Sequence, residues 1–95
     1  MSDMINEAVN ALNEKLSGGF DGIAKFVIEG EGAIMLDAGG VRAADEEADV
    51  TLTASADTFQ QILHGEMDPT SAFMSGKLSV DGDMGMAMKL GSALG

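Results

Sequence analysis

The sequence predicts an α+β domain in which a mainly antiparallel sheet carries helices packed on one face. Two observations predict this class. Apolar residues recur at helical spacing near both ends of the chain, whereas from about residue 22 to residue 54 they follow the period of strands. Helices and strands are also partly segregated along the chain, which is typical of α+β proteins. With 95 residues, the chain is assigned to one domain, residues 1–95.

The first predicted element is an amphipathic helix. Ser2 or Asp3 can cap its start, and Gly18-Gly19 ends it. Its apolar stripe consists of Ile5, Ala8, Val9, Leu12 and Leu16. The residues that face away are Asn6, Glu7, Asn13 and Glu14. Because its polar face lacks the Lys and Arg residues usual in membrane-surface helices, we expect this helix to pack on its own sheet.

Three or four strands follow this helix. Their expected ranges are Ile23–Glu29, Ala33–Asp37, Val41–Ala44 and Asp49–Ala54. Glycine-rich turns at 30–32 and 38–40 separate the first three, and the acidic run at 45–47 is interpreted as a solvated loop. In the last strand, Val50, Leu52 and Ala54 point inward. The pattern predicts an antiparallel meander with one buried face.

Helices and one more strand complete the chain. Ser55 caps a second helix that ends at Gly65, and Asp68-Pro69 begins a short third helix that ends at Gly76. Lys77–Asp81 alternates as a strand, with Leu78 and Val80 inward. After a turn at Gly82, Asp83 can cap a last helix over Met84–Leu94. Met84, Ala87, Met88 and Gly91 lie along one face of that helix.

The charge of the chain excludes several classes of partner. Asp and Glu number 16 against 5 Lys and Arg, for a net charge of -11 at pH 7. We therefore expect neither nucleic-acid binding nor stable membrane anchoring, because both need clustered cations. No segment approaches the roughly 20 apolar residues of a membrane span, and no signal peptide is visible. The expected location is the cytoplasm.

Candidate catalytic groups are few. Cysteine is absent, and His64, the only histidine, is predicted in the last turn of a helix, where a structural role is the stronger interpretation. No G-x-S-x-G elbow accompanies it. The acidic groups at 45–47 and 81–83 lack the spacing of a calcium loop, and solvation and capping explain them better. We therefore expect a non-catalytic protein with neither metal nor cofactor.

Methionine is the distinctive residue of the C-terminal part. Five of the eight methionines lie within or next to residues 68–90. Methionine is flexible and polarizable, so such a cluster can repack around apolar guests. On composition alone, the alternative that the methionines fill gaps in an ordinary core is favoured. The candidates for an apolar pocket are Phe59, Ile62, Leu63, Met67, Phe73, Met74, Leu78, Val80, Met84, Ala87 and Met88. For Leu78 and Val80, core packing is the stronger interpretation.

The segment from residue 48 to residue 94 resembles the sterol carrier protein-2 family of lipid-binding domains. The matching blocks are Ala48-Asp49-Val50-Thr51-Leu52, Asp57-Thr58-Phe59, Leu63-His64-Gly65, Asp68-Pro69, Ala72-Phe73, Gly76-Lys77-Leu78, Gly82-Asp83-Met84 and Met88-Lys89-Leu90. The spacing between the blocks also fits, and the N-terminal half agrees in pattern. The chain looks like a free-standing bacterial-type member.

The resemblance implies a five-stranded sheet covered by helices that enclose an apolar tunnel. It also implies binding of a fatty acid, fatty acyl-CoA or sterol-like lipid, with lipid transfer as a further role. It favours the pocket interpretation of the methionines, with a lipid carboxylate near Lys77 or Lys89. The predicted ligand-binding residues are Phe59, Ile62, Leu63, Met67, Phe73, Met74, Met84, Ala87 and Met88. The alternative is an accessory domain that docks a protein partner in lipid or quinone metabolism.

Overall fold

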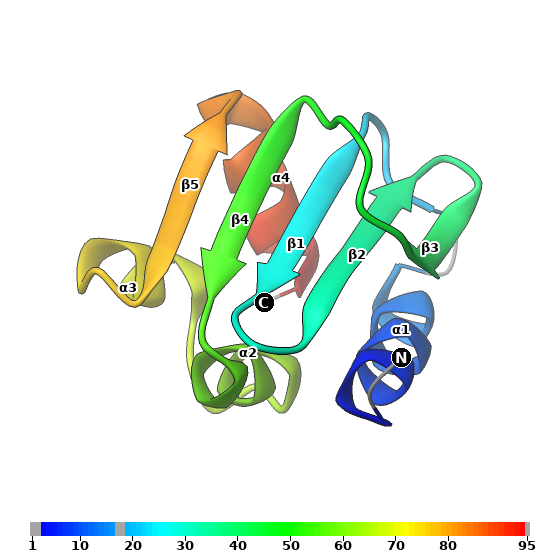
Figure 1. Cartoon of the computed structure of the whole chain (residues 1–95). Helices are drawn as coiled ribbons and strands as arrows, with labels where there is room; N and C mark the ends of the chain where they lie inside the picture. Colours follow the sequence, from blue (N-terminus) through cyan, green and yellow to red (C-terminus); the bar gives the residue numbers. More distant parts are fainter. Residues whose placement is uncertain (1–2, 17–18, 95) are drawn as a thin grey trace.

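The computed structural model describes residues 3–16 and 19–94, which form four helices and five strands (Figure 1). The helices are α1 (Asp3–Lys15), α2 (Ala56–Leu63), α3 (Pro69–Met74) and α4 (Met84–Leu94). The strands are β1 (Ala24–Ile28), β2 (Gly32–Asp37), β3 (Gly40–Ala43), β4 (Val50–Ala54) and β5 (Leu78–Gly82). Ser2 and Gly18, predicted at the two ends of the first helix, lie outside the described residues, whereas Asp3 lies in the first turn of α1.

The five strands form one mixed sheet in the order β3-β2-β1-β4-β5. β2 lies antiparallel to β1 and β3, and β5 lies antiparallel to β4. β4 is parallel to β1, with Leu52 opposite Phe26. The predicted antiparallel meander is therefore wrong at its fourth strand, although the sheet is mainly antiparallel. The period of a strand determines which side chains share a face, but it does not determine the neighbouring strand.

The connection between β3 and β4 explains the parallel pair. It leaves β3 at one edge and passes in front of β2 and β1 to reach the start of β4 (Figure 1). Backbone hydrogen bonds hold both of its ends: the Ala44 N–H donates to the Ala33 carbonyl at 3.3 Å, and the Asp49 N–H donates to the Ile23 carbonyl at 2.9 Å. Such an extended crossing places β4 beside β1, where a tight turn would have placed it beside β3.

Ion pairs tie this connection to the outer face of the sheet. Lys25 of β1 contacts the Asp45 carboxylate at 2.9 Å, and Arg42 of β3 contacts the Glu46 carboxylate at 2.7 Å. Lys25 and Arg42 flank Met35 in the strand register, and Met35 is only 1% exposed although it points away from the main core. The acidic run at 45–47, predicted as a solvated loop, is exposed, and the ion pairs of Asp45 and Glu46 hold it against the sheet.

The opposite face of the sheet carries the core. Phe26, Ile34 and Leu52 form one buried row across β2, β1 and β4. Every helix adds buried side chains to the same cluster, so the helices pack on one face, and α4 passes behind the sheet in Figure 1. Burying a large apolar side chain contributes about 1.5–3 kcal/mol, so this cluster is the main source of stability. The helical members are Ile5, Ala8, Leu12, Phe59, Ile62, Ala72, Ala87, Leu90 and Leu94.

Side-chain caps start the last three helices, as predicted. Ser55 caps α2, Asp68 caps α3 and Asp83 caps α4, each accepting a hydrogen bond from a first-turn backbone N–H at 3.2 to 3.3 Å. Gly82, the last residue of β5, has a φ of +106°, and a side chain there would collide with the Asp49 carbonyl. The change of direction from β5 into α4 therefore requires glycine.

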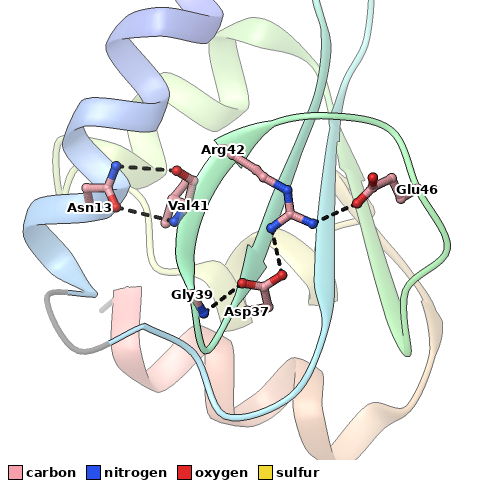
Figure 2. Close-up of polar contacts among 6 residues, drawn as sticks. All are labelled: Asn13, Asp37, Gly39, Val41, Arg42 and Glu46. Carbon is pink, nitrogen blue, oxygen red and sulfur yellow. Dashed lines mark hydrogen bonds and ion pairs between the residues drawn. The ribbon is translucent and has the colours of Figure 1, made fainter.

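Two sets of polar contacts hold β3 (Figure 2). The Asn13 side chain of α1 donates to the Val41 carbonyl at 3.5 Å and accepts from the Val41 N–H at 3.3 Å. Asn13 was predicted to face away from the sheet; it is exposed, yet it contacts the edge strand. On the other side of β3, Asp37 accepts hydrogen bonds from Arg42 at 2.7 Å and from the Gly39 N–H at 2.9 Å.

The second set perturbs two ionisable groups. The hydrogen bond from Arg42, followed by that from the Gly39 N–H, lowers the pKa of the Asp37 carboxyl below its ordinary value of 3.8. The same contact with Asp37, together with the Glu46 carboxylate, raises the pKa of Arg42. Both charges are therefore favoured in the folded state, and the turn between β2 and β3 is held by a charged network.

Candidate functional site

A pocket of about 340 Å³ lies between α3, β5 and α4, against the core face of the sheet. Its deep wall is apolar and comes from several elements. The volume of the pocket is near the lower end of the range typical of small-molecule sites. The buried residues of this wall are Phe26, Leu52, Pro69, Leu78, Ala87, Leu90 and Leu94.

The mouth of the pocket is formed by exposed apolar side chains of α3 and α4. Phe73 is 41% exposed and Met74 is 81% exposed, while Met84 is 46% and Met88 is 73% exposed. These four are among the five large hydrophobic residues with exposed side chains in the described part of the chain. We call Phe73, Met74, Met84 and Met88 the apolar rim. Exposed apolar groups that gather around one opening mark an interaction site more strongly than scattered ones do.

Helical spacing on α4 produces one wall of the pocket. Met84, Ala87, Met88 and Gly91 fall at i, i+3, i+4 and i+7, and all four line it. Asp83 sets the start of this helix through its cap. At the other end, a methyl group added to Gly91 would lie 3.7 Å from the Pro69 Cβ, which is an ordinary contact. The bare backbone at Gly91 therefore leaves space where α4 passes the start of α3.

The structure brings five of the nine predicted ligand-binding residues to the pocket. These five are Phe73, Met74, Met84, Ala87 and Met88. The other four lie elsewhere: Phe59 and Ile62 are buried core residues of α2, and Leu63 and Met67 are partly buried against the same core. The Phe59 ring stands edge-on to Phe26 with centroids 4.8 Å apart, so it supports the pocket wall from behind.

Several lining residues escaped the sequence analysis. Leu78 and Val80 were pocket candidates for which core packing was the stronger interpretation; both line the pocket, and Leu78 also belongs to the buried core. Leu52 comes from β4, whose alternation predicted the inward face but not its position relative to α4, and Phe26 of β1 was not singled out. Leu90 and Leu94 also line the pocket, and their helical spacing on α4 could have predicted this. The remaining lining residues not predicted are Pro69, Thr70, Gly91 and Ser92.

The lining carries no charged side chain among the described residues; its only polar side chains are those of Thr70 and Ser92. Lys77 and Lys89, predicted near a lipid carboxylate, lie outside the lining, and Lys89 pairs with Asp21 at 3.2 Å. His64 lies at the end of α2, outside the pocket. The pocket can therefore hold an apolar group through apolar contacts and the exclusion of water. Its lining offers no basic side chain that could activate the hydroxyl groups of Thr70 and Ser92.

Within residues 3–16 and 19–94, no group of three or more His, Cys, Asp or Glu side chains is arranged to hold a metal ion. None of the helices in that part of the chain is long and apolar enough to cross a membrane.

Residues 5–95 match the model of the SCP-2 sterol transfer family. The chain belongs to this family. A relative, hydroxysteroid dehydrogenase-like protein 2 of Xenopus tropicalis, is 41% identical over 98 residues, covering 94% of this chain and 24% of that protein. Sterol carrier protein 2 of Homo sapiens is 48% identical over 46 residues, covering 48% of this chain and 8% of that protein. This SCP-2 chain thus spans about a quarter or less of these relatives.

Solved structures of SCP-2 proteins share the fold. Sterol carrier protein-2 of Aedes aegypti, in complex with the fatty acid palmitate, superposes with a TM-score of 0.78. The alignment covers 99% of this chain and 96% of that one, at 22% sequence identity. At this identity the similarity establishes the mixed five-stranded sheet with its helices as the SCP-2 fold.

Proposed function

We propose that the chain binds a hydrophobic ligand, without catalysis, in the pocket between α3, β5 and α4. The candidates are a fatty acid, a fatty acyl-CoA or a sterol-like lipid, and lipid transfer is the corresponding role. The observation that carries this proposal is the pocket itself: its lining is uncharged, and its opening is surrounded by the apolar rim. Membership of the SCP-2 sterol transfer family supports it.

Apolar contact alone provides enough free energy for useful affinity. Each buried CH₂ group contributes about 0.8 kcal/mol, so burying most of a chain of ~16 carbons gains about 10 kcal/mol before association costs. Micromolar affinity requires about 8 kcal/mol. The pocket of about 340 Å³ would hold part of such a chain. We propose that the flexible methionines of the rim move apart to cover the remainder, completing the predicted tunnel around the ligand.

Binding of palmitate by the Aedes aegypti protein shows that this fold accommodates a long acyl chain in one of its members. A direct test is titration of this chain with a fluorescent long-chain fatty acid, followed by competition with unlabelled fatty acid, acyl-CoA and sterol. The intrinsic fluorescence cannot serve, because the chain has no Trp or Tyr. Saturable binding that one competitor class displaces is the expected result. Absence of binding up to the solubility limit of the lipid would overturn the proposal.

The variant Gly91→Leu tests whether the ligand binds in this pocket. Because the space beside Gly91 faces Pro69 within the pocket, a leucine side chain there should occupy the cavity and weaken binding at least about tenfold. The fold should tolerate the change, since leucine has a higher helix propensity than glycine. Ala93→Leu, at an exposed position of α4 outside the lining, is the matched control and should leave affinity unchanged. Equal affinity of both variants would place the site elsewhere.

A second candidate function is an accessory domain that docks a protein partner in lipid or quinone metabolism. The observation that favours it is length, because this chain matches only 24% of the Xenopus tropicalis relative. The two functions make different predictions for the rim. A docking surface would lose its partner in pull-down experiments when Met74 and Met88 are changed to Gln, while Gly91→Leu, placed deeper, would leave the complex intact.

A further inference from the structure

We propose that the pocket selects uncharged single-chain amphiphiles, such as a fatty alcohol or a fatty-acid ester, over the fatty-acid anion of the same chain length. This inference rests on the proposed function and ranks its candidate ligands. It follows from the charges around the pocket rather than from its volume. Three observations carry it: the neutral lining, the engagement of four of the five Lys and Arg side chains elsewhere, and the carboxylates that cap α3 and α4.

The neutral lining offers an anion no partner. Thr70 and Ser92 supply hydroxyl groups, and every other lining side chain in the described residues is apolar or is glycine. A hydroxyl or ester head group can be satisfied by such groups or by water at the mouth. A carboxylate drawn toward the same position loses hydration without gaining a cation, and desolvating an ionised group costs far more than desolvating a neutral one.

Four of the five Lys and Arg side chains make other contacts within the described residues. Lys25 pairs with Asp45, Arg42 pairs with Asp37 and Glu46, and Lys89 pairs with Asp21. Lys15 donates to the Leu94 carbonyl at 3.4 Å.

Lys77 is the one Lys or Arg without an ion pair or hydrogen bond among the described residues, and it is exposed and outside the lining. An incoming carboxylate therefore meets no free cation within the pocket.

Two carboxylates instead adjoin the lining in the chain, at the starts of α3 and α4. Asp68 directly precedes the lining residues Pro69 and Thr70, and Asp83 directly precedes Met84 of the rim. Both are exposed. Their repulsion adds to the field of a chain whose net charge is -11. Each carboxylate also caps a helix, and Asn caps a helix about as well as Asp does. The two charges can therefore be removed without removing the caps.

The test measures how dodecanol, methyl dodecanoate and dodecanoate each displace the uncharged dye Nile red at neutral pH, where the carboxylate is ionised. Wild type is compared with Asp68→Asn/Asp83→Asn. The matched control is Glu7→Gln/Glu14→Gln, which removes two exposed charges from α1 beside the opposite sheet edge. Circular dichroism and thermal unfolding verify that both variants remain folded.

In wild type, dodecanol and the ester are expected to bind about two- to fivefold more tightly than dodecanoate, a ratio typical of exposed charge interactions. Added salt should narrow this ratio. Asp68→Asn/Asp83→Asn should also narrow the ratio, because it strengthens the binding of dodecanoate alone. The control Glu7→Gln/Glu14→Gln should leave the ratio unchanged.

Tighter binding of dodecanoate than of dodecanol, or a ratio unaffected by Asp68→Asn/Asp83→Asn, would overturn this inference and leave the proposed function standing. Failure of all three compounds to bind would overturn both.

Discussion

Asn13 and Val41 form a side-chain-to-backbone pair that closes one edge of the sheet. The Asn13 amide donates to the Val41 carbonyl and accepts from its N–H, at 3.5 and 3.3 Å (Figure 2). A neighbouring strand would offer the same donor and acceptor. β3 is the outermost strand on this side, and unpaired edge groups invite pairing with other chains. A helix side chain thus protects the edge of a sheet to which it does not belong.

Replacing Asn13 tests this relationship. Asn13→Ala should be less stable than Asn10→Ala by about 0.5–1 kcal/mol, because both gain the same helix propensity but only the first loses two hydrogen bonds. Asn10 is exposed on the same helix. Urea unfolding of the two variants provides the measurement. Equal stabilities would show that the contact with Val41 contributes nothing.

Replacing Phe59 should affect mainly the stability of the fold, whereas replacing Phe73 should affect mainly ligand binding. Phe59 is fully buried behind Phe26, so Phe59→Ala should lower the free energy of unfolding by about 3–5 kcal/mol, a large part of the stability of a chain of this size. Phe73 is 41% exposed at the mouth, so Phe73→Ala should cost much less stability but weaken ligand binding several-fold. Denaturant unfolding and Nile red titration measure the two effects. The opposite assignment of effects would contradict the geometry of the pocket.

The pH dependence of stability should report the Asp37 contacts. Because its pKa is lowered in the folded state, ionised Asp37 contributes stability above its ordinary pKa of 3.8, and this contribution is lost as pH falls through the folded value. The difference in unfolding free energy between wild type and Asp37→Asn should therefore be constant near neutrality and shrink below about pH 4.

Arg42→Gln is the internal control for that measurement, because it removes the leading cause of the shift. NMR titration should show the pKa of Asp37 moving up toward its ordinary value in this variant. An unchanged pKa would assign the shift to the Gly39 N–H alone.

Oxidation of the rim should abolish its apolar character. Hydrogen peroxide converts the methionine thioether to a polar sulfoxide and is itself reduced to water. Met74 and Met88 should be modified first, Met84 next and Met35, which is 1% exposed, last. Affinity for Nile red should fall several-fold as the rim is modified.

The triple variant Met74→Leu/Met84→Leu/Met88→Leu keeps similar volume and should bind the dye with or without peroxide. Peptide mass spectrometry gives the order of modification. Equal sensitivity of wild type and this variant would show that the rim does not contribute to binding.

A cation installed at the rim should reduce or abolish the preference for dodecanol over dodecanoate. Met88 is 73% exposed, so Met88→Lys should fold normally and improve dodecanoate binding about two- to fivefold relative to dodecanol. Ala93→Lys makes the same change of net charge outside the lining. An equal improvement in both variants would mean that net charge, rather than the neutral lining, controls the preference.

Local features of the fold were predictable from sequence, because their causes are local. The caps at Ser55, Asp68 and Asp83 follow from side-chain oxygens placed just before helical segments. The pocket-facing side of α4 follows from spacing alone. By contrast, the parallel pairing of β1 with β4 depends on the path of the crossing connection, which no periodicity records.

The same limit explains why four of the nine predicted ligand-binding residues lie outside the pocket. Phe59 and Ile62 have the pattern of an apolar helix face, and a face against a core gives the same pattern as a face against a pocket. Leu52 was predicted to point inward, but only the packing of α4 against the sheet makes it part of a pocket wall together with Phe26. Likewise, the polar side of α1 gave no indication that Asn13 would contact β3.

The contiguity of α3, β5 and α4 has an evolutionary consequence. Apart from Phe26 and Leu52, every lining residue lies between positions 69 and 94, in one stretch added at the β4 edge of the sheet. Substitutions that reshape the pocket can therefore arise within this one short stretch, while the pairing of β1 with β2 and β4 stays unchanged. Substitutions within residues 69–94 alone could therefore change which ligand the pocket accepts.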